Sequence, residues 1–289
     1  NPPLIGAAVK VILVPAQIVV FGVFIETLGV LEGLTLMVIL LLLILLVETQ
    51  AALLHSNWKV VLSENDIYNY NSFLGMFNNV FDIPHDKRYI TADIALEGSD
   101  KFIIGCWYGR ELMDIKIIDK SNGKEVVDAI ISMAREHKVQ NKDICYDNDG
   151  VGGFVEGFIP GAIPFHNGGK PFPNPDLKYG DKDYKVPEKY EHLKAQCYYR
   201  SGKKVEAGEY KISEKVANTM YDDKMTVRQR FLHERKAIKK GKLDQDKNLC
   251  IIKKGEMKTK LNGQSPDIMD MFMMRERFDL DKKPEGFAF

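Results

Sequence analysis

The sequence predicts an α/β fold, in which helices flank a mixed sheet, preceded by an atypical hydrophobic N-terminal segment. Three observations predict it. Strand-like segments follow one another from residue 88, an amphipathic helical stripe and another apolar strand come next, and the first 48 residues are almost uncharged. A hairpin followed by a helical crossover to a further strand gives a mixed sheet with helices on its faces.

Composition narrows the class of protein. The chain has 289 residues, with 40 Lys and Arg against 40 Asp and Glu, so its net charge is zero. This excludes a polycationic protein but leaves room for local basic surfaces. The 45% hydrophobic and 28% charged content is typical of a folded chain. The four cysteines lie far apart without a CxxC pair, which argues against a disulfide framework and favours a reducing compartment.

The hydrophobic segment, residues 1–48, contains two uncharged runs, Val11–Ile25 of 15 residues and Leu34–Val47 of 14 residues. Each is shorter than the roughly 18–20 residues that span a bilayer. Three interpretations stay open: a buried or interfacial hairpin, membrane insertion, or a segment foreign to the fold, such as a shifted reading frame or a truncation scar. The chain begins at Asn1 rather than Met, as a fragment would. No role is assigned to residues 1–48.

The first predicted strands are Arg88–Ala95, Lys101–Tyr108 and Glu111–Asp119, all rich in β-forming residues. Only Gly109 and Arg110 separate the second from the third, which predicts a tight hairpin.

A helix is expected next over Glu125–His137, followed by a buried strand over Asp143–Tyr146. The helix carries apolar residues at i, i+3 and i+4 spacing, namely Val126, Ala129, Ile130, Met133 and Ala134. An acidic stretch, Asp147-Asn148-Asp149, and a glycine-rich turn come directly after the strand.

The remainder alternates loops and helices. Residues 166–187 are dense in Gly, Pro and Asn and predict a surface loop. Later elements are expected as helices over 188–199, 225–240 and 265–278 and a short strand over 249–252. In the last helix, Ser265 is the expected N-cap and Pro266 the first helical residue. We therefore divide the chain into the hydrophobic segment, a linker region 49–86, a domain 87–280 and a tail 281–289.

Carboxylates gather where these elements end. Asp93 lies within an apolar strand, where a carboxylate is costly unless it is paired or binds a cation. Asp147 follows a strand at the edge where open α/β sheets bind ligands, and Asp267 and Asp270 share one face of the last helix. Asp149 is a further candidate. Three or four carboxylate oxygens suit Mg²⁺ or Mn²⁺ rather than zinc.

Each carboxylate also has a purely structural interpretation. Asp267 is favourable in a first helical turn against the helix dipole. Asp147 and Asp149 suit a turn before Gly150, and Asp93 is compatible with a satisfied buried side chain. The sequence leaves these alternatives open for each residue alone, and the shared sheet edge favours the metal site.

Three motifs in order resemble a known family: KRYITADIALEGSDKFII, CYDNDGVGGFVEGFI and GQSPDIMDMFMMRERF. They resemble the nuclease domain of tailed-phage terminase large subunits, and the similarity extends over roughly residues 50–280. The resemblance implies a ribonuclease H-like fold and a two-metal-ion endodeoxyribonuclease. Such an enzyme cuts concatemeric viral DNA, in which genome copies are joined end to end, during packaging. It also implies that Asp93, Asp147 and Asp267 are catalytic metal ligands, with Asp149 and Asp270 as further ligands.

The same resemblance implies partners and a place of action. These are double-stranded DNA, the small terminase subunit and the portal, in the cytoplasm of an infected bacterial host cell; no membrane partner is expected. Members of the family also carry an ATPase motor before the nuclease. No G-x-x-x-x-G-K-[ST] phosphate loop exists in this sequence, so the chain is expected to cut DNA but not to pump it.

A basic region predicts how DNA is bound. Residues 224–260 contain 13 Lys and Arg against 4 Asp and Glu. The phosphate-binding residues are expected on one helix: Arg228, Arg230, Arg235, Lys236, Lys239 and Lys240. The alternative is a solvated lysine-rich face without a ligand. If the helix binds phosphates, the affinity for DNA depends steeply on salt and little on sequence.

Two other function classes stay open. One is another ribonuclease H-like nuclease, such as a transposase or a junction resolvase. The other is a membrane-associated structural protein built around the hydrophobic segment.

Overall fold

The computed structural model describes residues 65–78, 83–85, 87–96, 100–173, 189–242 and 248–280. The hydrophobic segment 1–48, the tail 281–289 and most of the linker region 49–86 lie outside the described residues, and so do the expectations about them. Within the described residues, no helix combines the length and the apolar character needed to cross a membrane.

A six-stranded mixed sheet forms the centre of the described fold, in the order β5-β4-β1-β2-β3-β6. The strands β1, β2 and β3 are antiparallel neighbours, whereas β4 runs parallel to β1, β5 parallel to β4, and β6 parallel to β3. The strand bounds are β1 Arg88–Asp93, β2 Phe102–Tyr108, β3 Glu111–Ile118, β4 Ile144–Asp147, β5 Ile163–Phe165 and β6 Lys211–Ile212. The expected α/β class with a mixed sheet is confirmed.

Helices pack against this sheet and are given in chain order. The α-helices are α2 Tyr70–Gly75, α3 Gly123–His137, α4 Leu193–Glu206, α5 Glu214–Asn218, α6 Val227–Arg235, α7 Lys254–Lys260, α8 Asp267–Met273 and α9 Arg277–Leu280. Three 3₁₀ segments, η1 Asn141–Asp143, η2 Gly150–Gly157 and η3 Met274–Glu276, complete the described helical elements.

The predicted hairpin between β2 and β3 is confirmed. Tyr108 pairs with Glu111, so Gly109 and Arg110 form the two-residue turn. Gly109 has φ 61°, and a Cβ there would collide with the carbonyl oxygen of Pro84. A side chain at this position is therefore excluded both by conformation and by space.

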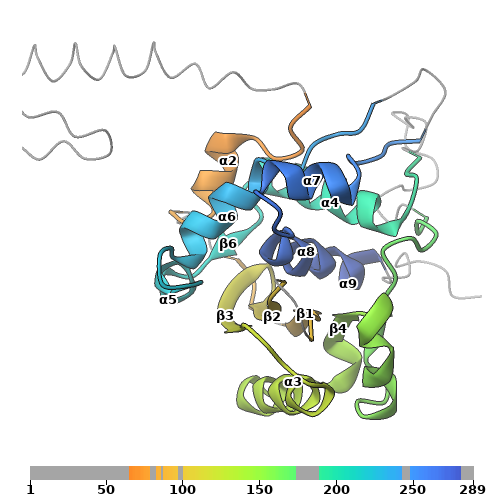
Figure 1. Cartoon of the computed structure of the whole chain (residues 1–289). Coiled ribbons are helices and arrows are strands. Elements are labelled where there is room, and N and C mark those ends of the chain that lie inside the picture. The colour runs from red at the N-terminus through yellow and green to blue at the C-terminus, as the bar shows by residue number, and fades with distance from the viewer. Residues whose placement is uncertain are drawn as a thin grey trace, which may run out of the picture. The chain divides into compact units, whose positions relative to one another are not determined.

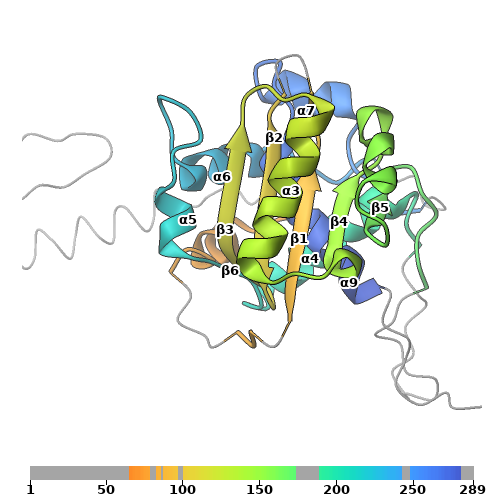
Figure 2. The same cartoon turned by 90° about the horizontal axis from the view of Figure 1, so that it is seen from below.

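Helices cover both faces of the sheet (Figure 1). On one face, α3 packs its apolar stripe against Ile90, Phe102 and Ile104, and Figure 2 shows this helix lying over the strands. On the other face, α4, α6 and α8 bury a second core that includes Trp107 and Phe272. The strands are thus buried on both sides, as expected for a sheet between two helical layers.

Helix α8 lies unusually close to the strands because β2 carries a glycine. A Cβ on Gly105 would collide with the sulfur of Met271, which belongs to α8. The close approach seats the first turn of α8 near the sheet, which positions the acidic residues of that turn.

Four elements differ from the sequence prediction. The helix expected over 188–199 is α4, which spans Leu193–Glu206. The helix expected over 225–240 is α6, which ends at Arg235. The strand expected over 249–252 consists of isolated bridges, Tyr190 with Leu249 and Lys240 with Ile251. The last helix begins at Asp267, and Ser265 is not its cap, because the Ser265 hydroxyl donates instead to Asp100 Oδ2 at 2.9 Å.

Candidate active site

The carboxylates converge at one end of the sheet. Asp93 is the last residue of β1 and Asp147 the last residue of β4, and these two strands are parallel neighbours. Asp267 and Asp270 come from the first turn of α8. All four line one cleft of about 1010 Å³, together with Asp100 and Asp149. The structure therefore places each of the acids that the sequence singled out on the same cleft.

Asp93 is the most unusual of these groups. It is 9% exposed, and within the described part of the chain its carboxylate has neither a hydrogen bond nor an ion-pair partner. Burial raises its pKa well above the ordinary value, and the neighbouring carboxylates of Asp270, Asp267 and Asp147 raise it further. A buried carboxylate surrounded by other carboxylates needs a proton or a cation to be stable.

Asp147 is held by the turn that follows β4. Its Oδ1 accepts hydrogen bonds from the Asp149 amide at 3.0 Å and from Asn167 Nδ2 at 3.2 Å. A Cβ at Gly152 would collide with the Asp147 carbonyl oxygen, so the glycine-rich turn needs Gly152 to fold back on the strand end. Burial raises the Asp147 pKa, while the hydrogen bond from the Asp149 amide lowers it.

Asp149 itself is half-exposed at the rim. Its Oδ2 accepts from the Asn167 amide at 2.9 Å, and its Oδ1 lies 3.5 Å from His166 Nδ1. Asp149 thus helps to fix the loop that carries Asn167.

Asp267 reaches the cleft from the start of α8. The Lys101 amide donates to its Oδ2 at 3.0 Å. Burial raises the pKa of Asp267 to about 7, the neighbouring Asp100 and Asp270 raise it as well, and the Lys101 amide and Arg230 lower it. Asp100 forms an ion pair with Lys258, whose Nζ lies 3.3 Å from Asp100 Oδ2.

Asp270 differs because both of its oxygens already have partners. Tyr198 donates to Oδ1 at 2.5 Å and Lys194 Nζ lies 2.8 Å from Oδ2. Both partners belong to α4, and Asp93 and Asp147 also raise the pKa of Lys194 by charge attraction. Lys194 and Tyr198 were not predicted from the sequence, since only the packing of α4 against α8 brings them to the acids. Their spacing of four residues on one helix was the only sign that they share a face.

The donor set fits a hard divalent cation. The six aspartates of the cleft offer carboxylate oxygens, and one of them, Asp93, is buried without a partner in the described residues. His192 and Cys250 also line the cleft, but His192 Nδ1 already accepts a hydrogen bond from the Ala195 amide at 3.0 Å. Mg²⁺ and Mn²⁺ prefer such oxygens, and a cation would relieve the repulsion that raises the pKa values.

Replacing Lys194 by methionine is expected to lower the stability of the metal-free protein by about 2 kcal/mol, because Asp270 loses its cation. The same change should increase the stabilisation by Mn²⁺, since one positive charge no longer competes with it. Thermal unfolding with EDTA and with Mn²⁺ measures both effects. The control is Lys142→Met, an exposed lysine after α3. A smaller Mn²⁺ effect in Lys194→Met than in the unmodified protein would contradict this account.

Solved structures provide the comparison. Neither a protein-family model nor a curated protein matches the sequence. The nuclease domain of the large terminase subunit gp2 of bacterial virus Sf6 is similar to 73% of this chain and to 97% of that domain, with a TM-score of 0.59 and 18% identity. A point mutant of that domain with calcium gives a TM-score of 0.58, again at 18% identity, over 73% and 98% of the two chains. This chain has the ribonuclease H-like fold of a terminase nuclease domain.

Within this terminase-nuclease fold, the basic residues of α6 do not gather at the cleft. None of the six that the sequence analysis assigned to DNA lines it. Arg230 and Arg235 are buried, and Lys236, Lys239 and Lys240 lie beyond the end of α6. The six therefore do not form one exposed helical face, because part of the charge is used inside the fold.

The two buried arginines form ion pairs and hydrogen bonds inside the fold. Arg230 Nε lies 2.5 Å from Glu234 Oε1, and its Nη2 donates to the Ser265 carbonyl at 2.9 Å. Arg235 donates to the Tyr68 carbonyl at 2.8 Å and pairs with Asp66, which also pairs with Lys239. Phosphate binding by Arg230 or Arg235 would require these buried contacts to break, so both are removed from the expected DNA-binding set.

Replacing Arg230 by methionine is expected to lower the free energy of unfolding by about 3 kcal/mol, because it leaves the fully buried Glu234 without its cation. Urea unfolding measures the loss. Arg135→Met, at an exposed site of α3, should change stability by less than about 0.5 kcal/mol. The double change Arg230→Met with Glu234→Met should recover part of the loss, and failure to do so would show that the ion pair is not the cause.

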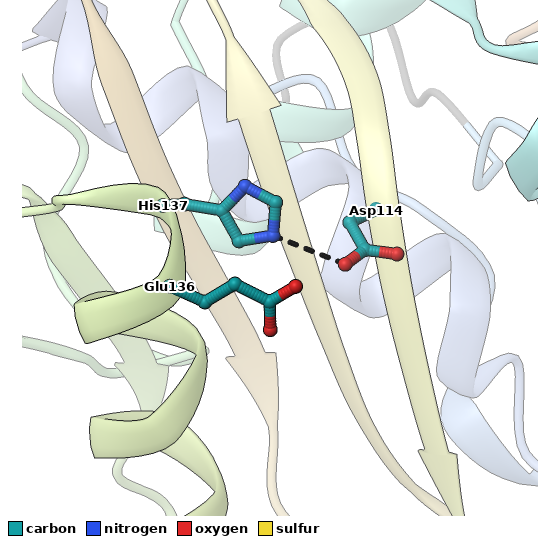
Figure 3. Close-up of side chains that lie close together, drawn as sticks. All are labelled: Asp114, Glu136 and His137. Atoms are coloured by element: carbon teal, nitrogen blue, oxygen red, sulfur yellow. Dashed lines mark hydrogen bonds and ion pairs between the residues drawn. The ribbon is translucent and has the colours of Figure 1, made fainter.

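A second cluster of possible ligands lies away from the cleft. Asp114 of β3 and Glu136 and His137 of α3 place one ligand atom each within 4.8 Å of one another (Figure 3). However, His137 Nε2 lies 3.0 Å from Asp114 Oδ2, and its Nδ1 lies 3.1 Å from the Tyr108 hydroxyl. Lys215 occupies the other oxygen of Asp114 at 3.0 Å. The polar atoms of Asp114 and His137 are thus already satisfied, and the cluster ties α3 to β3.

Proposed function

We propose that the chain is the nuclease module of a phage terminase large subunit, a metal-dependent endonuclease that cuts concatemeric viral DNA during genome packaging. The observation that carries the proposal is the buried Asp93, which has no hydrogen-bond or ion-pair partner among the residues that the structure describes, in a cleft shared with Asp147, Asp267 and Asp270. The terminase-nuclease fold supports it independently of the charges.

The carboxylates have distinct roles in this proposal. Asp93, Asp147 and Asp267 would hold two Mg²⁺ or Mn²⁺ ions, with Asp149 and Asp270 as further ligands. Two divalent ions supply a water that is deprotonated near neutral pH and stabilise the leaving 3′-oxygen. Nuclease domains of the Sf6 gp2 protein have been solved with manganese and with calcium, which supports a divalent cation here.

Other residues keep the acids in place. The Lys101 amide orients Asp267, Asn167 orients Asp147, and Tyr198 with Lys194 orients Asp270. Lys194 also reduces the repulsion within the site while it holds no other cation. Lys101 directly precedes β2, Asn167 follows β5 by two residues, and Lys194 and Tyr198 belong to α4, so residues next to the sheet and on a covering helix determine the geometry of the site.

The proposed context is that of the family: cutting in the cytoplasm of an infected bacterial cell, together with a small terminase subunit and a portal. An assay of the full chain on supercoiled plasmid tests the activity. Nicked and linear products are expected with Mn²⁺ or Mg²⁺ and none with EDTA. A chain that binds Mn²⁺ but leaves plasmid intact under all conditions would refute the nuclease. Strand-transfer products or a strong preference for branched DNA would favour a transposase or a resolvase instead.

A further inference from the structure

The cleft is lined by lysines as well as by acids. Lys242, Lys253 and Lys254 line it together with Asp93, Asp147 and the other carboxylates. All three lysines are exposed, and within the described part of the chain none of them makes an ion pair with a carboxylate. They differ in this respect from Lys194 and Lys258, the lysines that are paired with acids of the site.

The backbone brings these lysines together. The Gly241 amide donates to the Cys250 carbonyl at 2.8 Å, and the Ile252 amide donates to the Lys239 carbonyl at 3.1 Å. Two antiparallel segments are thereby joined just before Lys242 and just before Lys253, and Lys254 begins α7. A Cβ at Gly241 would collide with the Cys250 sulfur, so the segments approach as closely as a glycine allows. In Figure 2 the arrowheads of β1 and β4 point toward the end of the molecule at which α7 lies.

A polyanionic substrate such as DNA needs cationic side chains at an acidic cleft. The phosphates of DNA are repelled by a cleft that six aspartates line, and cations at the same cleft offset this repulsion. Lysine ammonium groups without a carboxylate partner need not break an ion pair before they contact phosphate. The basic stretch 224–260 thus divides in two: much of its first half is used in buried or paired contacts, and its second half reaches the cleft.

We propose that Lys242, Lys253 and Lys254 bind backbone phosphates of duplex DNA beside the acidic centre, in place of the α6 residues. The proposal rests on the proposed nuclease function. Because ammonium groups contact phosphate without reading bases, the contact holds DNA of any sequence and fixes the cut strand relative to Asp93. Lys253 and Lys254 are adjacent in the chain, and Lys242 lies across the paired segments from them, so the three contact more than one phosphate.

The test compares three triple variants of the full chain, each with three lysines or arginines changed to glutamine. The first changes Lys242, Lys253 and Lys254. The second changes Arg228, Lys236 and Lys240, and the third changes the exposed Lys116, Lys120 and Lys142 as a control of equal charge. Binding of a fluorescein-labelled 30-base-pair duplex is measured by anisotropy in Ca²⁺ over a range of salt, and a gel verifies that the duplex stays intact.

The first variant should bind at least about tenfold more weakly, and the slope of log K against log salt should fall by about 2–3, since each phosphate contact contributes about 0.9. The other two variants should bind nearly as the unmodified protein does. Stabilisation by Mn²⁺ alone should be unchanged in the first variant, which shows that its acidic centre is intact. An equal loss in the control variant, or a larger loss in the second variant, would overturn the proposal.

The two proposals can fail separately. If the unmodified chain cuts plasmid and the first variant binds DNA normally, the lysine assignment is wrong and the nuclease stands. If the unmodified chain never cuts DNA but the first variant alone loses binding, the lysines are a DNA site and the nuclease function is wrong.

Discussion

Changing Asp93 to asparagine is expected to reduce Mn²⁺-dependent cleavage of plasmid by on the order of a thousandfold, a loss of about 4 kcal/mol of transition-state stabilisation. Asparagine keeps the volume of the side chain and one of its oxygens but removes the negative charge that two cations would share. Because the carboxylate of Asp93 has no hydrogen-bond or ion-pair partner among the described residues, the change breaks no such contact. The measurement is the initial rate of nicking at saturating Mn²⁺.

The fold should tolerate this substitution. Burial and the carboxylates of Asp270, Asp267 and Asp147 already hold the Asp93 pKa well above its ordinary value, so a neutral amide should leave the metal-free protein at least as stable as before. Asp128→Asn is the matched control, since Asp128 is exposed on α3 and pairs only with Lys124 among the described residues. Undiminished nicking by Asp93→Asn would remove Asp93 from the site, whereas unfolding of the variant would show that the carboxylate is structural.

Local sequence patterns were sufficient to predict the centre of the fold. The β-rich segments and the two-residue turn predicted β1 to β3, and the helical stripe predicted α3, in which the residues of that stripe are all buried. The short edge strands β5 and β6 were missed because three and two residues leave no recognisable period. The last helix was predicted too long at its start, since Ser265 satisfies Asp100 rather than the helix amides.

The candidate site was also predicted only in part: its acids could be found from the sequence, and its basic residues could not. Asp93 was predicted as a carboxylate within an apolar strand and Asp147 as one that follows such a strand, and the structure makes each the last residue of its strand. The lysines could not be assigned, because charge density in the sequence does not show which cations are already paired. Arg230 and Arg235 look like surface residues in the sequence and are ion-paired inside the fold. Lys194 looks incidental in the sequence and lies among the acids.

The metal-free protein is expected to become less stable as the pH rises from 4 to 8, and Asp267 should account for about 4 kcal/mol of the loss. Its pKa is about 7 in the folded protein, against an ordinary value of 3.8. Between these values the folded state holds a proton that the unfolded chain has released. The contribution is therefore complete below pH 3.8 and is lost as the pH passes through 7.

The groups around Asp267 explain the direction of this effect. Burial raises its pKa most, and Asp100 and Asp270 add repulsion, which together outweigh the hydrogen bond from the Lys101 amide and the attraction of Arg230. Asp267→Asn removes the ionisable group and leaves these neighbours in place. The difference in free energy of unfolding between this variant and the unmodified protein, measured by urea in EDTA, should therefore grow by about 4 kcal/mol from pH 4 to pH 8.

Divalent cations should reverse the loss, because they bind the ionised carboxylates that high pH produces. At a Mn²⁺ concentration one hundred times the dissociation constant, the gain at pH 8 is about 2.7 kcal/mol, or roughly 5–10 °C in Tm for a chain of this size. The gain should shrink at pH 5, where protons compete for the same oxygens, and it should be smaller in Asp267→Asn than in Asp128→Asn at either pH. A Mn²⁺ effect that is equal at both pH values and in both variants would place the cation away from these carboxylates, and with it the chemistry that the cleft is proposed to support.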